Sequence, residues 1–90
     1  MGVFYLTKFI KQLRKAPKDI QSSTKIRIDL FINNPHHPLL RNHLLTGQYK
    51  GCRSINVTGD WRAIYYESTS LIDKPSVTFI EFGTHSQLYR

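Results

Sequence analysis

The chain has 90 residues and a formal net charge of +7, from 13 Lys and Arg against six Asp and Glu. This length supports a single domain over residues 1–90, and the charge favours a polyanionic partner, with acidic membrane surfaces or acidic proteins as alternatives. One cysteine excludes an internal disulfide, and charged or polar residues interrupt every apolar run, so we expect a cytoplasmic protein with neither signal peptide nor membrane span.

The N-terminal half is predicted to be mainly helical. Residues 3–6 favour a short strand, and Thr7, as N-cap, is expected to begin a helix that ends before Pro17. Pro17 is well placed to start a second helix to about Asn33, because apolar residues recur there at helical spacing. The short turn between them predicts a helical hairpin that covers one face of a sheet.

The C-terminal half is predicted to consist of strands. Residues 36–48 directly follow Pro35, contain Pro38 and show no sustained period, so they are predicted to form a loop that carries His43. Three β-favouring runs follow, at 52–58, 61–68 and 76–82, separated by the Gly59-Asp60 turn and by a loop at 69–75. Helices followed by an antiparallel meander predict an α+β fold.

Strand alternation assigns the side chains of the predicted sheet to faces but does not identify the covered face. One face of the central strand holds Trp61, Ala63 and Tyr65, the other holds Arg62, Ile64 and Tyr66, and the preceding strand places Arg53 with Ile55 and Val57. None of these sets is purely apolar. The face that packs on the helices therefore stays open.

The segment GQYKGCRSINVTGDWRAIYYE, followed by FGTHSQLYR, resembles the RelE/ParE toxin superfamily and most closely its YafQ-like branch. The resemblance implies a RelE-like fold, with an N-terminal helical hairpin on a twisted antiparallel sheet of about four strands. It also implies an mRNA interferase of a type II toxin–antitoxin system, acting on ribosome-bound mRNA without metal or cofactor. A cognate antitoxin protein would silence it.

Two residues match catalytic positions that the resemblance implies: His85 matches the His that YafQ-like toxins carry just after their last strand, and Arg62 matches a strand Arg of RelE-like members that some YafQ-like members replace. His85 would be the general acid, since an imidazole titrates near neutral pH and can protonate a departing alkoxide. Arg62 would stabilise the pentavalent transition state, because a guanidinium offers a planar fork to two phosphate oxygens. The alternatives are a His that only binds the chain terminus and an Arg paired with Glu67 or Glu81.

His43 and Asp60 match a second His and an acid that assist in YafQ-like sites, where they receive the 2′-OH proton or orient a neighbour. Asp60 follows Gly59 and fits a hairpin turn equally well. A third His of the family pattern falls at Asn56 here. This departure shifts the expected charge stabilisation toward Arg62, Lys50 and Arg53.

Lys50, Arg53 and Tyr89 are the expected RNA-binding residues. The two cations would hold phosphates, and Tyr89 matches a C-terminal aromatic that can stack on a base. Solvated charges and packing of the chain end are the alternatives. Adjacent His36 and His37 could chelate a metal, but four scattered His and one Cys lack paired-ligand spacing, so we expect no metal site.

Two other functions share the predicted fold. A ParE-like toxin would inhibit DNA gyrase by binding alone, and a repurposed module would only bind RNA. His85 with Tyr89 beside it argues against the ParE-like function, because a non-catalytic binder does not need this arrangement. Cys52 is expected in the core, since no partner motif would activate its thiol.

Overall fold

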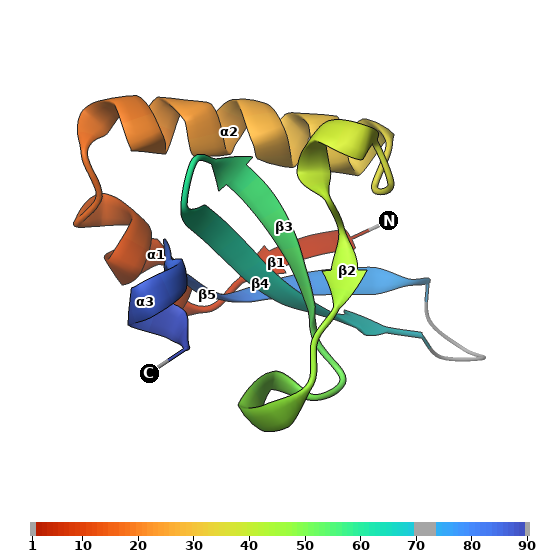
Figure 1. The fold of residues 1–90 in the computed structure, drawn as a ribbon. Helices are drawn as coiled ribbons and strands as arrows, with labels where there is room; N and C mark the ends of the chain where they lie inside the picture. Colours follow the sequence, from red (N-terminus) through yellow and green to blue (C-terminus); the bar gives the residue numbers. More distant parts are fainter. Residues whose placement is uncertain (1, 70–73, 90) are drawn as a thin grey trace.

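The computed structural model describes residues 2–69 and 74–89 (Figure 1). The elements are β1 (Gly2–Tyr5), α1 (Thr7–Arg14), α2 (Lys18–Asn33), β2 (His43–Leu44), β3 (Arg53–Thr58), β4 (Trp61–Ser68), β5 (Ser76–Thr84) and α3 (His85–Leu88), with 3₁₀ turns η1 (Pro38–Leu40) and η2 (Gly47–Tyr49) on either side of β2. This arrangement confirms the predicted α+β class. Residues 70–73 of the predicted loop at 69–75 lie outside the described part. No helix of the described part is long and apolar enough to cross a bilayer.

The two predicted helices are present, but their first residues differ slightly from the prediction. Leu6 is the N-cap of α1 and Thr7 is already helical, so the predicted capping role of Thr7 is wrong. Pro17 is the N-cap of α2, which begins at Lys18. The Pro17 carbonyl accepts a hydrogen bond from the backbone N–H of Gln21 at 3.0 Å. Proline has no backbone N–H, but an N–H at this position would have no partner within the helix, so proline is tolerated there.

The described strands form one sheet in the order β1-β5-β4-β3-β2. Two expectations need correction. The sheet has five strands rather than about four, because β2 pairs with β3 inside the region predicted as a loop. It is also not wholly antiparallel, since β1 runs parallel to β5, with Val3 opposite Val77.

The helices cover the face of the sheet that carries Ala63 and Tyr65. Phe31 of α2 lies edge-on to Tyr65 with ring centroids 4.8 Å apart, and Phe9 of α1 lies 5.5 Å from Phe79 of β5. All four aromatic side chains are almost fully buried. Aromatic pairs of this kind contribute about 0.5–1.5 kcal/mol each beyond the area they bury. This packing identifies the helix-covered face of the sheet, which strand alternation alone did not.

A smaller cluster lies on the opposite face. Ile64 of β4 is fully buried there against Leu45 and Leu88, and Cys52 packs against the same group. Burial raises the pKa of the Cys52 thiol. Leu88 belongs to α3, so this second cluster fixes the short C-terminal helix on the open side of the sheet.

A bulge in β5 changes the alternation along that strand. Ile64 pairs with Glu81 and the next residue, Tyr65, pairs with Phe79, so Ile80 has no partner in β4. One extra residue on one strand defines a β-bulge. Because of it, Phe79 and Phe82 both point into the helix-covered core although they are three residues apart.

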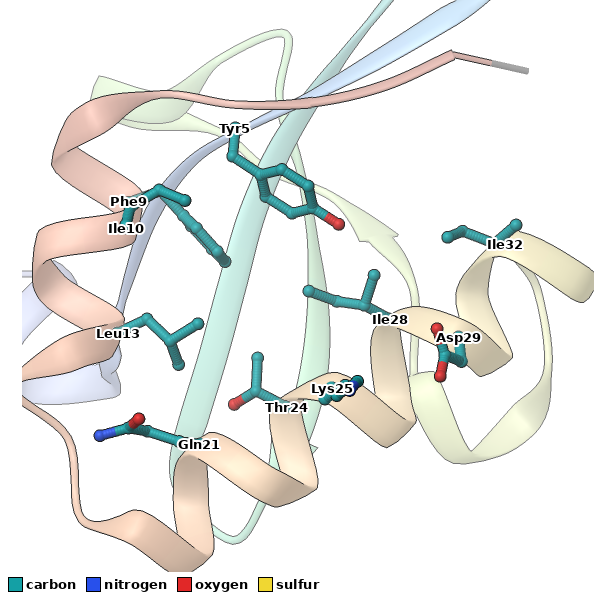
Figure 2. A pocket seen from close by; sticks show the side chains of 10 residues that line it. All are labelled: Tyr5, Phe9, Ile10, Leu13, Gln21, Thr24, Lys25, Ile28, Asp29 and Ile32. Atoms are coloured by element: carbon teal, nitrogen blue, oxygen red, sulfur yellow. The ribbon is translucent and has the colours of Figure 1, made fainter.

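A groove of about 420 Å³ runs between α1 and α2 (Figure 2). Figure 2 shows Phe9 and Leu13 of α1 pointing toward Thr24 and Ile28 of α2, with Tyr5 of β1 at the upper end. The Thr24 hydroxyl donates a hydrogen bond to the Ile20 carbonyl at 2.7 Å, which satisfies this buried polar group within the helix. The groove is therefore mainly apolar.

Candidate active site

The open face of the sheet contains a hollow of about 320 Å³. Its lining residues come from β2, β3, β4, α3 and the positions that directly follow η1, β2 and α3: Arg41, His43, Leu45, Asn56, Arg62, His85 and Tyr89. Four of the seven expected site residues, namely His43, Arg62, His85 and Tyr89, are among them. The lining residues include no carboxylate, so the hollow is suited to an anion.

Arg62 is placed by the β3–β4 hairpin. It lies opposite Asn56 in β3 and opposite Gly83 in β5. Its Nη1 donates to the carbonyls of Gly59 at 3.0 Å and Trp61 at 3.3 Å. These contacts orient the guanidinium and use only part of its five N–H groups.

The alternative partners expected for Arg62 are not bound to it in the described structure. Glu81 instead forms an ion pair with Lys8 and accepts a hydrogen bond from the Tyr49 hydroxyl. No ion pair links Glu67 to a cation of the described residues. Arg62 is thus available to a ligand.

His85 is the first residue of α3 and is exposed. Thr84 caps the helix, since its hydroxyl accepts from the backbone N–H of Gln87 and the Gln87 side chain accepts from the N–H of Thr84. The backbone N–H of His85 donates to the Asp60 carbonyl at 3.1 Å. Capping and this bond hold the imidazole at the rim of the hollow.

His43 has a defined tautomer in this structure. Its Nδ1 lies 2.8 Å from the carbonyl oxygen of Arg41, which can only accept a hydrogen bond. Nδ1 therefore carries the proton, and in the neutral ring Nε2 keeps the lone pair. A histidine in this state can take up a proton at Nε2.

Tyr89 lies at the end of α3, half-buried. Its ring centroid is 4.7 Å from that of His85 and 5.6 Å from that of Tyr49. Burial raises the pKa of Tyr89, and the nearby charge of Arg62 partly opposes this shift. The phenol is therefore neutral near pH 7 and can serve as a stacking surface.

Three expected site residues do not line the hollow. Asp60 contributes its backbone carbonyl rather than its carboxylate. Lys50 is exposed after η2, away from the lining. Arg53 lies opposite Tyr65 on the helix-covered side, where its Nε donates to Asn42 at 2.8 Å. The structure does not bring these side chains to His85.

The sequence reasoning missed Arg41 and Leu45 as lining residues and did not give Asn56 a role. Asn56 was detectable, because a hairpin closed at Gly59-Asp60 places it close to Arg62. Arg41 had no such signal, since its position depends on a left-handed backbone (φ 45°) after η1.

No three His, Cys, Asp or Glu side chains gather into a possible metal-binding group in the part of the chain that the structure describes. His37 has a local structural contact, because its Nδ1 accepts from the backbone N–H of Leu39 at 3.1 Å. It caps η1 rather than pairing with His36.

Comparisons with known proteins agree on one family. Residues 3–90 match the family model described as a bacterial toxin of type II toxin–antitoxin systems, YafQ. The chain is 35% identical over 85 residues to the mRNA interferase toxin YafQ of Escherichia coli K12, which covers 92% of this chain and 86% of that protein.

Solved structures resemble this chain over nearly its whole length. The crystal structure of YafQ from E. coli BL21(DE3) is 30% identical with a TM-score of 0.78, over 99% of this chain and 98% of that one. The toxin in the E. coli DinJ–YafQ toxin–antitoxin complex is 30% identical with a TM-score of 0.75, over 99% and 97%. A YoeB/ParE toxin from Agrobacterium tumefaciens, at 17% identity, 94% and 99% coverage and a TM-score of 0.73, shares the fold.

Proposed function

The chain belongs to the YafQ family of bacterial type II toxins, and from this membership we propose that it is an endoribonuclease that cleaves mRNA. The observation that carries the proposal is that His43, Arg62 and His85 line one hollow without a carboxylate. Cleavage of a phosphodiester fits such a site, because the reaction needs a base, an acid and a cation around the phosphate.

The proposed reaction is attack of the ribose 2′-oxygen on the adjacent phosphorus. Nε2 of His43 takes the 2′-OH proton as the O2′–P bond forms, and the P–O5′ bond breaks. Protonated His85 gives its proton to the departing 5′-oxygen. The products are a 2′,3′-cyclic phosphate and a 5′-hydroxyl, and proton exchange with water restores both imidazoles.

Arg62 stabilises the charge that builds on the phosphoryl oxygens. Its orientation by the Gly59 carbonyl supports this role, since a donor fixed before reaction needs no reorganisation in the transition state. Tyr89 stacks on a base beside the cleaved bond, a contact that contributes about 1–3 kcal/mol by alanine substitution. Asp60 supports His85 through its backbone, and Lys50 and Arg53 have no part in the hollow.

The mRNA is proposed to be bound on the ribosome, in the cytoplasm. The net charge of +7 supports this, because lysines and arginines can dock on ribosomal RNA phosphates through salt-sensitive contacts. The test compares the cleavage rate of one labelled mRNA free in solution with its cleavage rate in a programmed ribosomal complex. Equal cleavage of both would remove the ribosome from the proposal and leave the chemistry intact.

The chemistry is tested with three variants on the same labelled mRNA. His85→Ala should lower the rate by about 10²–10⁴-fold, the usual contribution of general acid catalysis. Arg62→Ala should lower it by about 10²–10³-fold. His36→Ala is the matched control, because His36 is exposed and lies outside the hollow. Full activity of the His85 variant, or intact transcripts with disturbed DNA supercoiling, would overturn the proposal.

A protein antitoxin is the proposed partner, and the groove between α1 and α2 in Figure 2 is its proposed docking site. The charge supports an acidic amphipathic segment as occupant, because α1 carries Lys8, Lys11 and Arg14 and no acidic residue. Apolar side chains of such a segment would cover the groove.

Substitution on α2 tests this docking site. Ile32→Asp places a charge in the groove and should weaken co-purification with the cognate antitoxin. Ile26→Asp is the control, since Ile26 is 67% exposed on the same helix and does not line the groove. Equal retention of the antitoxin by both variants would place the docking site elsewhere.

A further inference from the structure

A second hollow of about 470 Å³ adjoins the candidate active site. The two share three lining residues, Arg41, Asn56 and Arg62. The second hollow adds Arg27 from α2 and Leu39 from η1, so it extends from the open face of the sheet toward the helical layer. An extended ligand held at His85 and Arg62 can therefore continue directly into it.

The charge of this second hollow is the feature that favours a bound anion. It gathers three arginines, and none of its lining residues is acidic. Arg27 donates from Nη1 to the Leu39 carbonyl at 3.1 Å, and Arg62 donates to Gly59, so backbone carbonyls orient both guanidiniums. No described carboxylate forms an ion pair with any of the three. Like charges held together in this way repel one another, and a bound anion would remove that cost.

The backbone at Arg41 gives a second, independent indication. Arg41 is the single described non-glycine residue with positive φ, at 45°. Non-glycine residues in such conformations cost about 1–3 kcal/mol and gather at functional sites. A glycine or asparagine would fit this turn with less strain, so the position is better explained by use of the side chain.

We propose that the second hollow binds a phosphate of the RNA backbone that neighbours the cleaved one. The inference rests on the proposed function and extends it from a single phosphodiester to a longer footprint on the strand. Leu39, 58% exposed at the hollow, offers an apolar surface to the ribose or base attached to that phosphate. Continuity with the active site favours RNA over an acidic protein segment as the occupant.

Binding of short RNAs tests the proposal. The probes are fluorescent RNAs of two and six nucleotides, 2′-O-methylated so that they cannot be cleaved, and the measurement is fluorescence anisotropy over a series of salt concentrations. Arg27→Gln and Arg41→Gln should each weaken binding of the hexanucleotide by about tenfold, the loss expected for a charge-assisted contact. Each should also lower the salt slope by about 0.7. Binding of the dinucleotide should not change in Arg27→Gln, because Arg27 lies outside the hollow that contains His85, and should weaken in Arg41→Gln, because Arg41 lines both hollows.

Arg14→Gln is the matched control, because it removes the same charge from an exposed site on α1 outside both hollows. Equal weakening by this variant, or equal weakening of both RNA lengths by Arg27→Gln, would overturn the second hollow as a phosphate site. A poly-glutamate peptide that needs Arg27 and Arg41 while the hexanucleotide does not would also overturn it, in favour of a protein ligand.

Cleavage of a labelled mRNA separates this failure from failure of the proposed function. We expect Arg27→Gln to raise KM by about tenfold and to leave kcat unchanged, since Arg27 lies outside the hollow that contains His85. Cleavage by the wild type with no KM change in the variant would overturn the subsite alone. Absence of cleavage by the wild type would overturn the proposed function.

Discussion

Replacement of Tyr49 by Phe removes one hydroxyl from the contact that holds α3 and leaves the aromatic ring in place. The Tyr49 hydroxyl donates to the Glu81 carboxylate and lies 3.2 Å from the Leu88 carbonyl oxygen. Gln48 donates to the same Leu88 carbonyl at 2.7 Å. Burial and the Glu81 contact raise the pKa of Tyr49 to about 12, so the phenol is a hydrogen-bond donor at all ordinary pH values.

The size of the effect follows from the charge of the acceptor. A hydrogen bond to a charged group contributes about 1.5–3 kcal/mol to stability. Here Lys8 still pairs with Glu81 after the substitution, so the carboxylate is not left without a partner. We therefore expect a loss near the lower limit, about 1.5 kcal/mol, which corresponds to a Tm lower by roughly 6–12 °C for a domain of this length.

Urea unfolding at pH 7 provides the assay, with Tyr49→Phe, Glu81→Gln and the double variant in one cycle. The two single losses should not add, because they remove the same bond, and the coupling free energy should be about 1 kcal/mol. Tyr66→Phe is the control, since Tyr66 is exposed on β4 with no hydrogen bond to a described residue. A loss under about 0.5 kcal/mol, or additive losses, would refute the reasoning.

The pH dependence of the same variants has a defined sign. Burial raises the pKa of Glu81, but hydrogen bonds from Lys8 and Tyr49 outweigh it, so the net pKa lies below its ordinary 4.5. A depressed carboxyl pKa stabilises the fold above the unfolded-state value and loses this effect as pH falls through the folded-state value. The stability difference between the wild type and Glu81→Gln should thus be full at pH 7 and shrink below about pH 4.5.

Three further variants have definite expected outcomes. Asn42→Ala should lower the free energy of unfolding by about 2 kcal/mol in urea, because the Tyr65 hydroxyl, 2.7 Å from the Asn42 amide, loses its partner in the core. Arg41→Gly should raise the Tm in calorimetry by several degrees, since glycine relieves about 1 kcal/mol of left-handed strain, while RNA binding weakens. Gly83→Ala should lower both the Tm and the cleavage rate, because its Cβ would lie 2.9 Å from Gln87 Oε1 and disturb the cap of α3. Unchanged values in any of the three would contradict the corresponding contact.

The elements with strong periodicity could be predicted from the sequence. The helices α1 and α2 and the strands β3 to β5 follow from local apolar spacing, which reports the side that a segment buries. Strand β2 could not be found in this way, since two residues, His43 and Leu44, carry no period. The parallel pairing of β1 with β5 joins the two ends of the chain, and no local pattern encodes it.

The candidate site was predictable in part, for reasons visible in single residues. The family motif identified His85 and Arg62, and the hollow contains both. Arg53 is predicted to bind RNA, although strand alternation places its side chain on the same face as Ile55. The identity of the covered face was the missing fact, because Ile55 proves to be fully buried in the helix-covered core and Arg53 then faces the same side.

The bulge at Ile80 explains why an arginine in β4 and a histidine after β5 reach one hollow. Tyr65 of β4 pairs with Phe79 of β5, and both side chains point into the core. If this pairing register continued without the bulge, Arg62 would lie opposite Phe82. Phe82 would then point to the open face, and alternation would turn His85 toward the helices. The extra residue moves the register by one, so that Arg62 lies opposite Gly83. His85 follows two positions after Gly83 and lines the same hollow as Arg62. The bulge thus keeps Phe79 and Phe82 in the core and brings Arg62 and His85 together.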